Sequence, residues 1–131
     1  MKTSKADKWF SLYIRLRDTD EDGVCRCITC GRAGHPKSMD CGHYIKRQHQ
    51  AVRFDEINCN AQCKRCNAFE QGQDAIYRQR LIEKHGEDAV FILETAAKMA
   101  FKRSQINLDY LADEYKRKAK EEAEKKGIKL W

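Results

Sequence analysis

Two Cys-x-x-Cys pairs constrain this chain more than any other feature of its sequence. The pairs are Cys27-Ile-Thr-Cys30 and Cys63-Lys-Arg-Cys66. Each pair can hold a metal from a tight turn, and four thiolates at about 2.3 Å close a tetrahedral zinc site. A closed site does no chemistry of its own. The spacing therefore predicts a structural zinc that holds other residues in place, first of all His43 in the intervening segment.

The composition fits a zinc-stapled domain with a polyanionic partner. Of 131 residues, 41% are hydrophobic and 35% are charged, so we expect one domain with a modest core. A core of this size commonly needs an additional stabilising element, and a bound zinc ion can provide it. The net charge of +6 and the pI near 9.0 favour nucleic acid as the partner. The alternative is a solvated basic surface that binds nothing in particular.

The cysteine count indicates a reducing compartment. Seven is an odd number, and the sequence begins with the polar Met-Lys-Thr-Ser-Lys. No apolar run resembles a signal peptide or a membrane span. We therefore expect a cytosolic protein with thiolates on metal and no membrane partner. Cys25 could replace Cys27 as a ligand, and Cys41 and Cys59 are expected to be small buried residues on strands.

Hydrophobic periodicity predicts an α+β fold. Helices are expected over 5–17, immediately after Cys66, over 74–85, over 87–101 and from about 104; strands are expected over 24–29, 38–45 and 57–62. The chain is interpreted as a single domain, 1–131, with a small zinc core at 24–72 and a helical extension at 73–131. The charged end of the last helix is expected to be solvated and to fray towards Trp131, with a nucleic-acid arm as the alternative.

The order strand, loop, strand, helix across 38–72, with a cysteine pair at each end, resembles a treble-clef HNH (ββα-metal) nuclease finger. The resemblance implies that His43, which ends the first strand, is the general base. It also implies a structural or catalytic role for Asn58, five residues before Cys63. Asn67, directly after Cys66, would bind a catalytic divalent ion.

A closer resemblance is to the bacteriophage lambda NinG family, also called Rap. It rests on Asp40-Cys-Gly-His-Tyr-Ile, Arg53-Phe-Asp-Glu-Ile-Asn58 and Gln62-Cys-Lys-Arg-Cys-Asn67, and extends over roughly residues 5–95. The family is known for phage recombination proteins that act on branched DNA. The resemblance implies a structure-selective endonuclease or adaptor that acts on Holliday-type junctions and strand-invasion intermediates in the bacterial host cytosol. Recombination proteins would be further partners, and symmetric cleavage would favour a homodimer.

The chemistry of phosphodiester hydrolysis also favours a histidine base and oxygen ligands for a divalent ion. A neutral imidazole such as His43 can take a proton from water at neutral pH, and Mg²⁺ or Mn²⁺ can neutralise the developing charge. Gly42 occupies the position before the base, where this superfamily often has a ligand, so we expect Asp40 on the same strand face to bind the catalytic ion with Asn67. Glu70 is the alternative to Asp40. Asn58 is expected to pin the histidine-bearing loop by hydrogen bonds.

Basic residues flank this predicted centre. DNA contacts are expected from Lys46, Arg47, Arg53, Lys64 and Arg65. No base-reading element is evident, so we expect recognition of shape and backbone. The leading hypothesis is a Mg²⁺- or Mn²⁺-dependent HNH endodeoxyribonuclease with structural zinc. The alternatives are a non-catalytic zinc protein that binds branched DNA and recruits recombinases, and a zinc-stapled RNA-binding or purely structural module.

Overall fold

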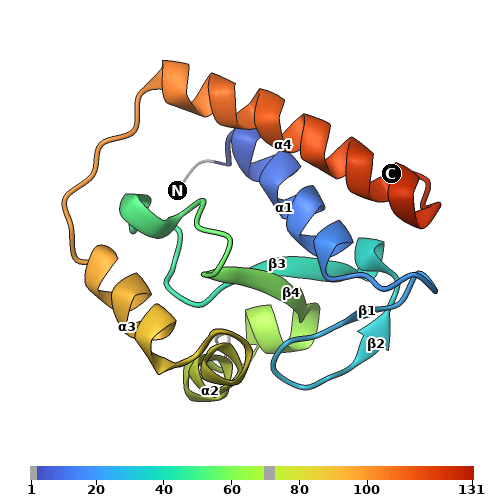
Figure 1. Ribbon diagram of the computed structural model, residues 1–131, viewed down its shortest axis with the longest axis horizontal. Helices are drawn as coiled ribbons and strands as arrows, with labels where there is room; N and C mark the ends of the chain where they lie inside the picture. Colours follow the sequence, from blue (N-terminus) through green and yellow to red (C-terminus); the bar gives the residue numbers. More distant parts are fainter. Residues whose placement is uncertain (1–2, 70–72) are drawn as a thin grey trace.

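Two small antiparallel sheets lie among helices in the computed structural model, which describes residues 3–69 and 73–131 (Figure 1). The order is α1 (Lys5–Arg17), β1 (Cys25–Arg26), β2 (Ala33–Gly34), η1 (Pro36–Ser38), β3 (Met39–His43), η2 (Gln50–Val52), β4 (Cys59–Cys63), η3 (Arg65–Phe69), α2 (Asp74–His85), α3 (Glu87–Ala96) and α4 (Gln105–Lys126). Both η1 and η2 are 3-10 helices, and η3 is a π-helix. The predicted α+β class is confirmed.

Helix α1 begins where its sequence provides a capping box. The Ser4 side chain accepts a hydrogen bond from the Asp7 backbone amide, and the Asp7 carboxylate accepts from the Ser4 amide at 2.8 Å. These bonds satisfy amide groups that the first turn leaves without helical partners. The helix buries Phe10 and Ile14 against the rest of the protein. The predicted boundaries, 5–17, are confirmed.

Helix α4 lies along α1 and runs in the same direction (Figure 1). Tyr115 packs edge-on against Phe10 at 4.8 Å between ring centroids, and Ala119 packs against Leu16 further along both helices. At the far end, the Lys126 ammonium donates to the Leu16 carbonyl at 2.7 Å. The expectation that this end frays is therefore wrong, whereas its charged face is solvated as expected, with an exposed ion pair between Arg117 and Glu121. Small alanines on the other face let the helix pack closely on α1.

The β3–β4 hairpin lies between α1 and α2 (Figure 1). Its register pairs His43 with Cys59 and Met39 with Cys63. Because side chains alternate across a strand, Cys41 and His43 share one face with Cys59. That face packs on α1, where Cys59 belongs to the same buried cluster as Phe10. The opposite face packs on α2.

Three predicted elements are shorter than expected. The strand expected over 24–29 is limited to β1, because the chain turns into the first cysteine pair, where the Cys27 amide donates to the Arg32 carbonyl at 2.9 Å. The strand expected over 38–45 is limited to β3. Helix α3 ends at Ala96 instead of residue 101, and Met99 beyond it is 69% exposed. Among the described residues, no helix is both long and apolar enough to cross a bilayer.

Candidate functional site

The four cysteines of the two Cys-x-x-Cys pairs converge on one point. One sulfur atom each from Cys27, Cys30, Cys63 and Cys66 lies within 4.8 Å of the other three. The Cys30 and Cys63 sulfurs are 3.7 Å apart. The edge of a tetrahedron with metal–sulfur bonds of about 2.3 Å is roughly 3.8 Å, so this spacing fits a zinc ion. The prediction that these residues could hold a structural metal is confirmed.

Local hydrogen bonds shape the four-cysteine centre. The first pair turns sharply at Gly31, whose φ of +77° favours glycine and whose amide donates to the Cys27 carbonyl at 2.9 Å. Burial alone would raise the pKa of Cys27, but hydrogen bonds from the Thr29 hydroxyl and nearby amides lower it to about 6. Cys66 accepts a hydrogen bond from the Gln73 side-chain amide at 3.2 Å. The donors to Cys27 stabilise its thiolate, which is the form that binds zinc, whereas burial raises the pKa of Cys66 to about 12.

Cys25 lies outside the four-cysteine cluster. Its sulfur is 3.6 Å from the Arg15 carbonyl oxygen, and burial raises the pKa of its thiol to about 11. The alternative in which Cys25 replaces Cys27 is therefore not supported, since Cys27 supplies the converging sulfur.

Next to the metal centre, a cleft gathers the residues predicted to carry chemistry. Asp40, His43 and Asn67 all line it, and so do Arg47 and Lys64. The hairpin supplies the first two residues, and η3 supplies Asn67. Because β4 leads directly from Cys63 into η3, a metal on the four cysteines would fix Asn67 relative to the hairpin.

His43 is half-buried and has a defined ring orientation. Its Nε2 atom lies 3.0 Å from the Arg53 carbonyl oxygen. A carbonyl oxygen can only accept, so Nε2 carries the proton in the neutral ring and Nδ1 retains its lone pair. Burial lowers the pKa of His43 and the nearby Arg47 charge lowers it further, although the bond to the Arg53 carbonyl opposes this. The ring is thus held neutral at pH 7, the state a general base requires.

Asp40 and Asn67 are hydrogen-bonded to each other. The Asn67 side-chain amide donates to one Asp40 carboxylate oxygen at 3.1 Å, and the Lys64 ammonium donates to the other at 2.8 Å. A carboxylate oxygen and a side-chain amide oxygen are ligand types suited to Mg²⁺ or Mn²⁺. The alternative ligand, Glu70, lies outside the described residues.

Asn58 is completely buried and touches the loop that follows His43. Its Oδ1 accepts from the Ile45 amide at 2.8 Å, and its Nδ2 donates to the carbonyls of Ile45 and Val52. These bonds join both ends of the segment between β3 and β4, as expected for a residue that pins this loop. Asn58 does not line the cleft.

Comparison with known proteins gives the family. A family profile described as "Bacteriophage Lambda NinG protein" matches residues 2–126. The chain belongs to the NinG family. Over 92 residues, it is 35% identical to protein ninG of Escherichia phage 933W, 36% identical to that of Salmonella phage P22 and 34% identical to that of Escherichia phage lambda. No solved structure matches.

The similarity to these NinG proteins is partial in extent. Each match covers 70% of this chain but 43% of the relative. The chain therefore aligns with less than half the length of the curated relatives, and what the whole NinG proteins do is considered for this chain only as a proposal.

The predicted DNA contacts of this NinG-family chain lie in different surroundings. Arg47 and Lys64 line the cleft, and Arg65 is exposed beside the four-cysteine centre. Lys46 is half-buried and makes an ion pair with Asp74 at 3.4 Å. These four remain candidates for phosphate contacts.

Arg53 requires a correction. Its side chain is 6% exposed and donates to the Asp7 carboxylate at 2.9 Å, so it lies inside the protein rather than on a DNA-binding surface. The charge of Arg53 is evident from the sequence, but its partner is not, because Asp7 lies 46 residues away along the chain. The motif Ser4-x-x-Asp7 identifies a capping box, and nothing in the sequence indicates that the same carboxylate also holds an arginine.

Gly42 is a second feature that the sequence did not explain. A Cβ atom on Gly42 would lie 2.0 Å from the Gln62 Oε1 atom and 2.9 Å from the Gln62 Cβ atom. The Gly42 carbonyl accepts a hydrogen bond from the buried Tyr77 hydroxyl at 2.6 Å. Gln62 thus fills the space where a larger residue before His43 would project.

Proposed function

We propose that this chain is a divalent-metal-dependent endonuclease of the HNH type that acts on branched DNA recombination intermediates, such as Holliday-type junctions and strand-invasion loops. The observation that carries the proposal is the cleft beside the four-cysteine centre, which His43 lines together with the hydrogen-bonded pair Asp40 and Asn67. Membership of the NinG family supports the association with phage recombination.

Each residue has a separate task in the proposed reaction. His43 accepts the proton of the attacking water at Nδ1, because Nε2 is the protonated nitrogen that is bonded to the Arg53 carbonyl. Asp40 and Asn67 would hold Mg²⁺ or Mn²⁺, which would neutralise the charge that develops on the scissile phosphate. Arg47 and Lys64 line the same cleft and attract the DNA backbone. The four-cysteine zinc is structural.

A non-catalytic adaptor that binds branched DNA is the competing proposal. One observation favours it: both carboxylate oxygens of Asp40 are already bonded, one to Lys64 and one to Asn67. An ion would have to displace the Lys64 ammonium, whose side chain is 64% exposed and can swing into solvent.

A cleavage assay separates the two proposals. Labelled four-way junction, flap and linear duplex are incubated with the zinc-bound protein, with and without Mg²⁺ or Mn²⁺. We expect metal-dependent nicking of branched substrates, its loss in His43→Ala, and unchanged junction affinity in that variant. His49→Ala is the matched control, since His49 is an exposed histidine that does not line the cleft. Junction binding by the wild type without nicking, over several divalent ions, would refute the enzyme and leave the adaptor.

A further inference from the structure

We infer that Cys41, His43 and Cys59 form a second metal site, which takes a thiophilic divalent ion such as Zn²⁺. One sulfur from each cysteine and one ring nitrogen of His43 lie within 4.8 Å of one another. The sulfur atoms of the four structural cysteines lie within the same limit of 4.8 Å. Two sulfurs and one imidazole nitrogen make three of the four ligands of a tetrahedral zinc site.

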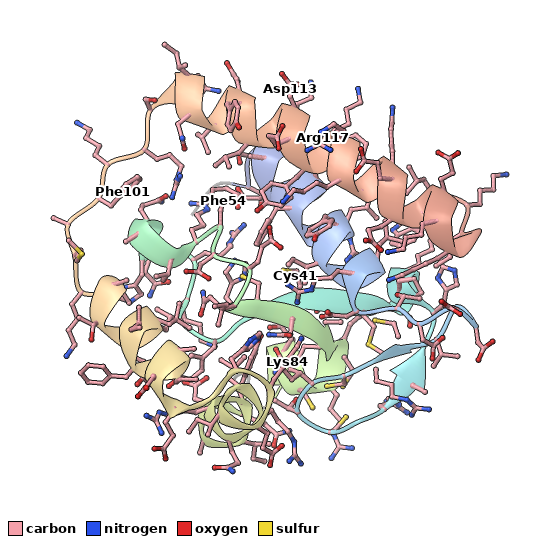
Figure 2. All side chains as sticks on the ribbon, in the orientation of Figure 1. Cys41, Phe54, Lys84, Phe101, Asp113 and Arg117 are labelled. Atoms are coloured by element: carbon pink, nitrogen blue, oxygen red, sulfur yellow. The ribbon has the colours of Figure 1, made fainter. Side chains whose placement is uncertain are left out.

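The hairpin register creates this arrangement. His43 is paired with Cys59 across the sheet, and Cys41 is two residues before His43 on the same face. Figure 2 shows Cys41 where the hairpin meets α1. Cys41 and His43 line the cleft, whereas Cys59 is fully buried behind them. An ion can therefore enter from the cleft, and a water molecule there can complete the coordination.

The surroundings of His43 suit a metal ligand. A ligating histidine usually donates its other ring N–H to a backbone carbonyl or a carboxylate, which fixes the ring and its tautomer. With Nδ1 as the ligand, the contact of 3.0 Å between His43 Nε2 and the Arg53 carbonyl is of that kind; the Cys59 sulfur lies 3.9 Å from the same carbonyl oxygen. Arg53 is itself held by Asp7, so the carbonyl is anchored from α1.

The ligand chemistry separates this site from the oxygen site at Asp40 and Asn67. Thiolate and imidazole select zinc or other soft ions, whereas carboxylate and amide oxygens suit Mg²⁺ or Mn²⁺. One consequence rests on the proposed function: a zinc ion on His43 removes the base, so excess zinc should inhibit cleavage. The metal site itself does not depend on that function.

The test counts metal per chain without DNA. The full chain is prepared with one zinc, and its zinc content is measured by native mass spectrometry as buffered free Zn²⁺ is raised. We expect a second zinc in the wild type, and only one in Cys41→Ser and in His43→Ala. Cys25→Ser is the matched control and should still bind two zinc ions, because Cys25 is a buried thiol that belongs neither to the four-cysteine centre nor to the second metal site.

Spectroscopy identifies the ligands of the second ion. Addition of Co²⁺ to the one-zinc protein should produce the thiolate-to-cobalt absorption of a tetrahedral centre while the zinc count stays at one. Absence of this absorption from Cys41→Ser supports the site. A wild type that stops at one metal, or a second metal that survives in both Cys41→Ser and His43→Ala, would overturn it. Two metals without inhibition of cleavage would leave the site intact and refute His43 as the base.

Discussion

The ion pair between Asp7 and Arg53 gives the sharpest quantitative prediction. The two side chains are 7% and 6% exposed, and Asp7 also accepts hydrogen bonds from the Ser4 amide and hydroxyl. Replacing Asp7 by asparagine keeps the side-chain volume but leaves the Arg53 guanidinium buried without a counter-charge.

The expected cost is large because water cannot replace the lost partner. Breaking a buried ion pair on one side typically costs about 3–5 kcal/mol. A domain of this size has a total stability of roughly 5–15 kcal/mol, so Asp7→Asn should remove about a fifth of it at the least and nearly all of it at the most. At roughly 3–5 °C per kcal/mol, the melting temperature should fall by about 10–25 °C.

Urea unfolding of the zinc-bound protein, followed by circular dichroism, measures this loss. Glu121→Gln is the matched control, because it breaks an ion pair with Arg117 in which both side chains are more than half exposed, and it should change the unfolding free energy far less. A double-mutant cycle of Asp7→Asn with Arg53→Gln isolates the interaction free energy between the two side chains. A loss below about 1 kcal/mol, or no coupling in the cycle, would mean that Arg53 is not buried with Asp7 in solution.

The same pair has a defined pH dependence. Burial alone would raise the pKa of Asp7, but hydrogen bonds from Arg53 and Ser4 outweigh burial and lower it below the ordinary aspartate value. The unfolded chain therefore binds this proton more readily than the folded one. The stability that Asp7 contributes should be fully present above about pH 4 and be lost as the pH falls towards the folded-state pKa. The difference between the wild type and Asp7→Asn should narrow over that interval.

Further predictions concern the zinc centre, the hairpin and the DNA-binding cleft. Chelation of zinc should unfold the β hairpins, measured as lost circular dichroism and a lower melting temperature; an unchanged melt after verified zinc removal would refute a structural metal. Gly42→Ala should cost about 1–3 kcal/mol in urea unfolding because its Cβ overlaps Gln62, and a neutral effect would show that Gln62 is free to move. Arg47→Gln should reduce the salt slope of junction binding by about one unit, whereas Arg53→Gln should leave that slope unchanged.

Local patterns in the sequence were enough to predict the metal centre and much of the secondary structure. Two Cys-x-x-Cys pairs predict a zinc cluster because each pair is a compact turn whose geometry depends on few neighbours. Helix α1 has its capping box and apolar stripe within one short segment, so its boundaries follow from sequence. The end of α2 at His85, directly before Gly86, likewise follows from the sequence.

Long-range contacts determined the side-chain partners and the burial that the sequence did not predict. The partners of Asp7 and Asp40 come from segments far along the chain, so neither the burial of Arg53 nor the bond from Asn67 to Asp40 could be read from spacing. Helix α4 shows the same limit: its charged sequence indicates a solvated helix, but burial of Ala119 depends on the complementary face of α1. Sequence thus determined the turns and helices, whose hydrogen bonds are local, and tertiary packing determined which polar side chains share one cleft.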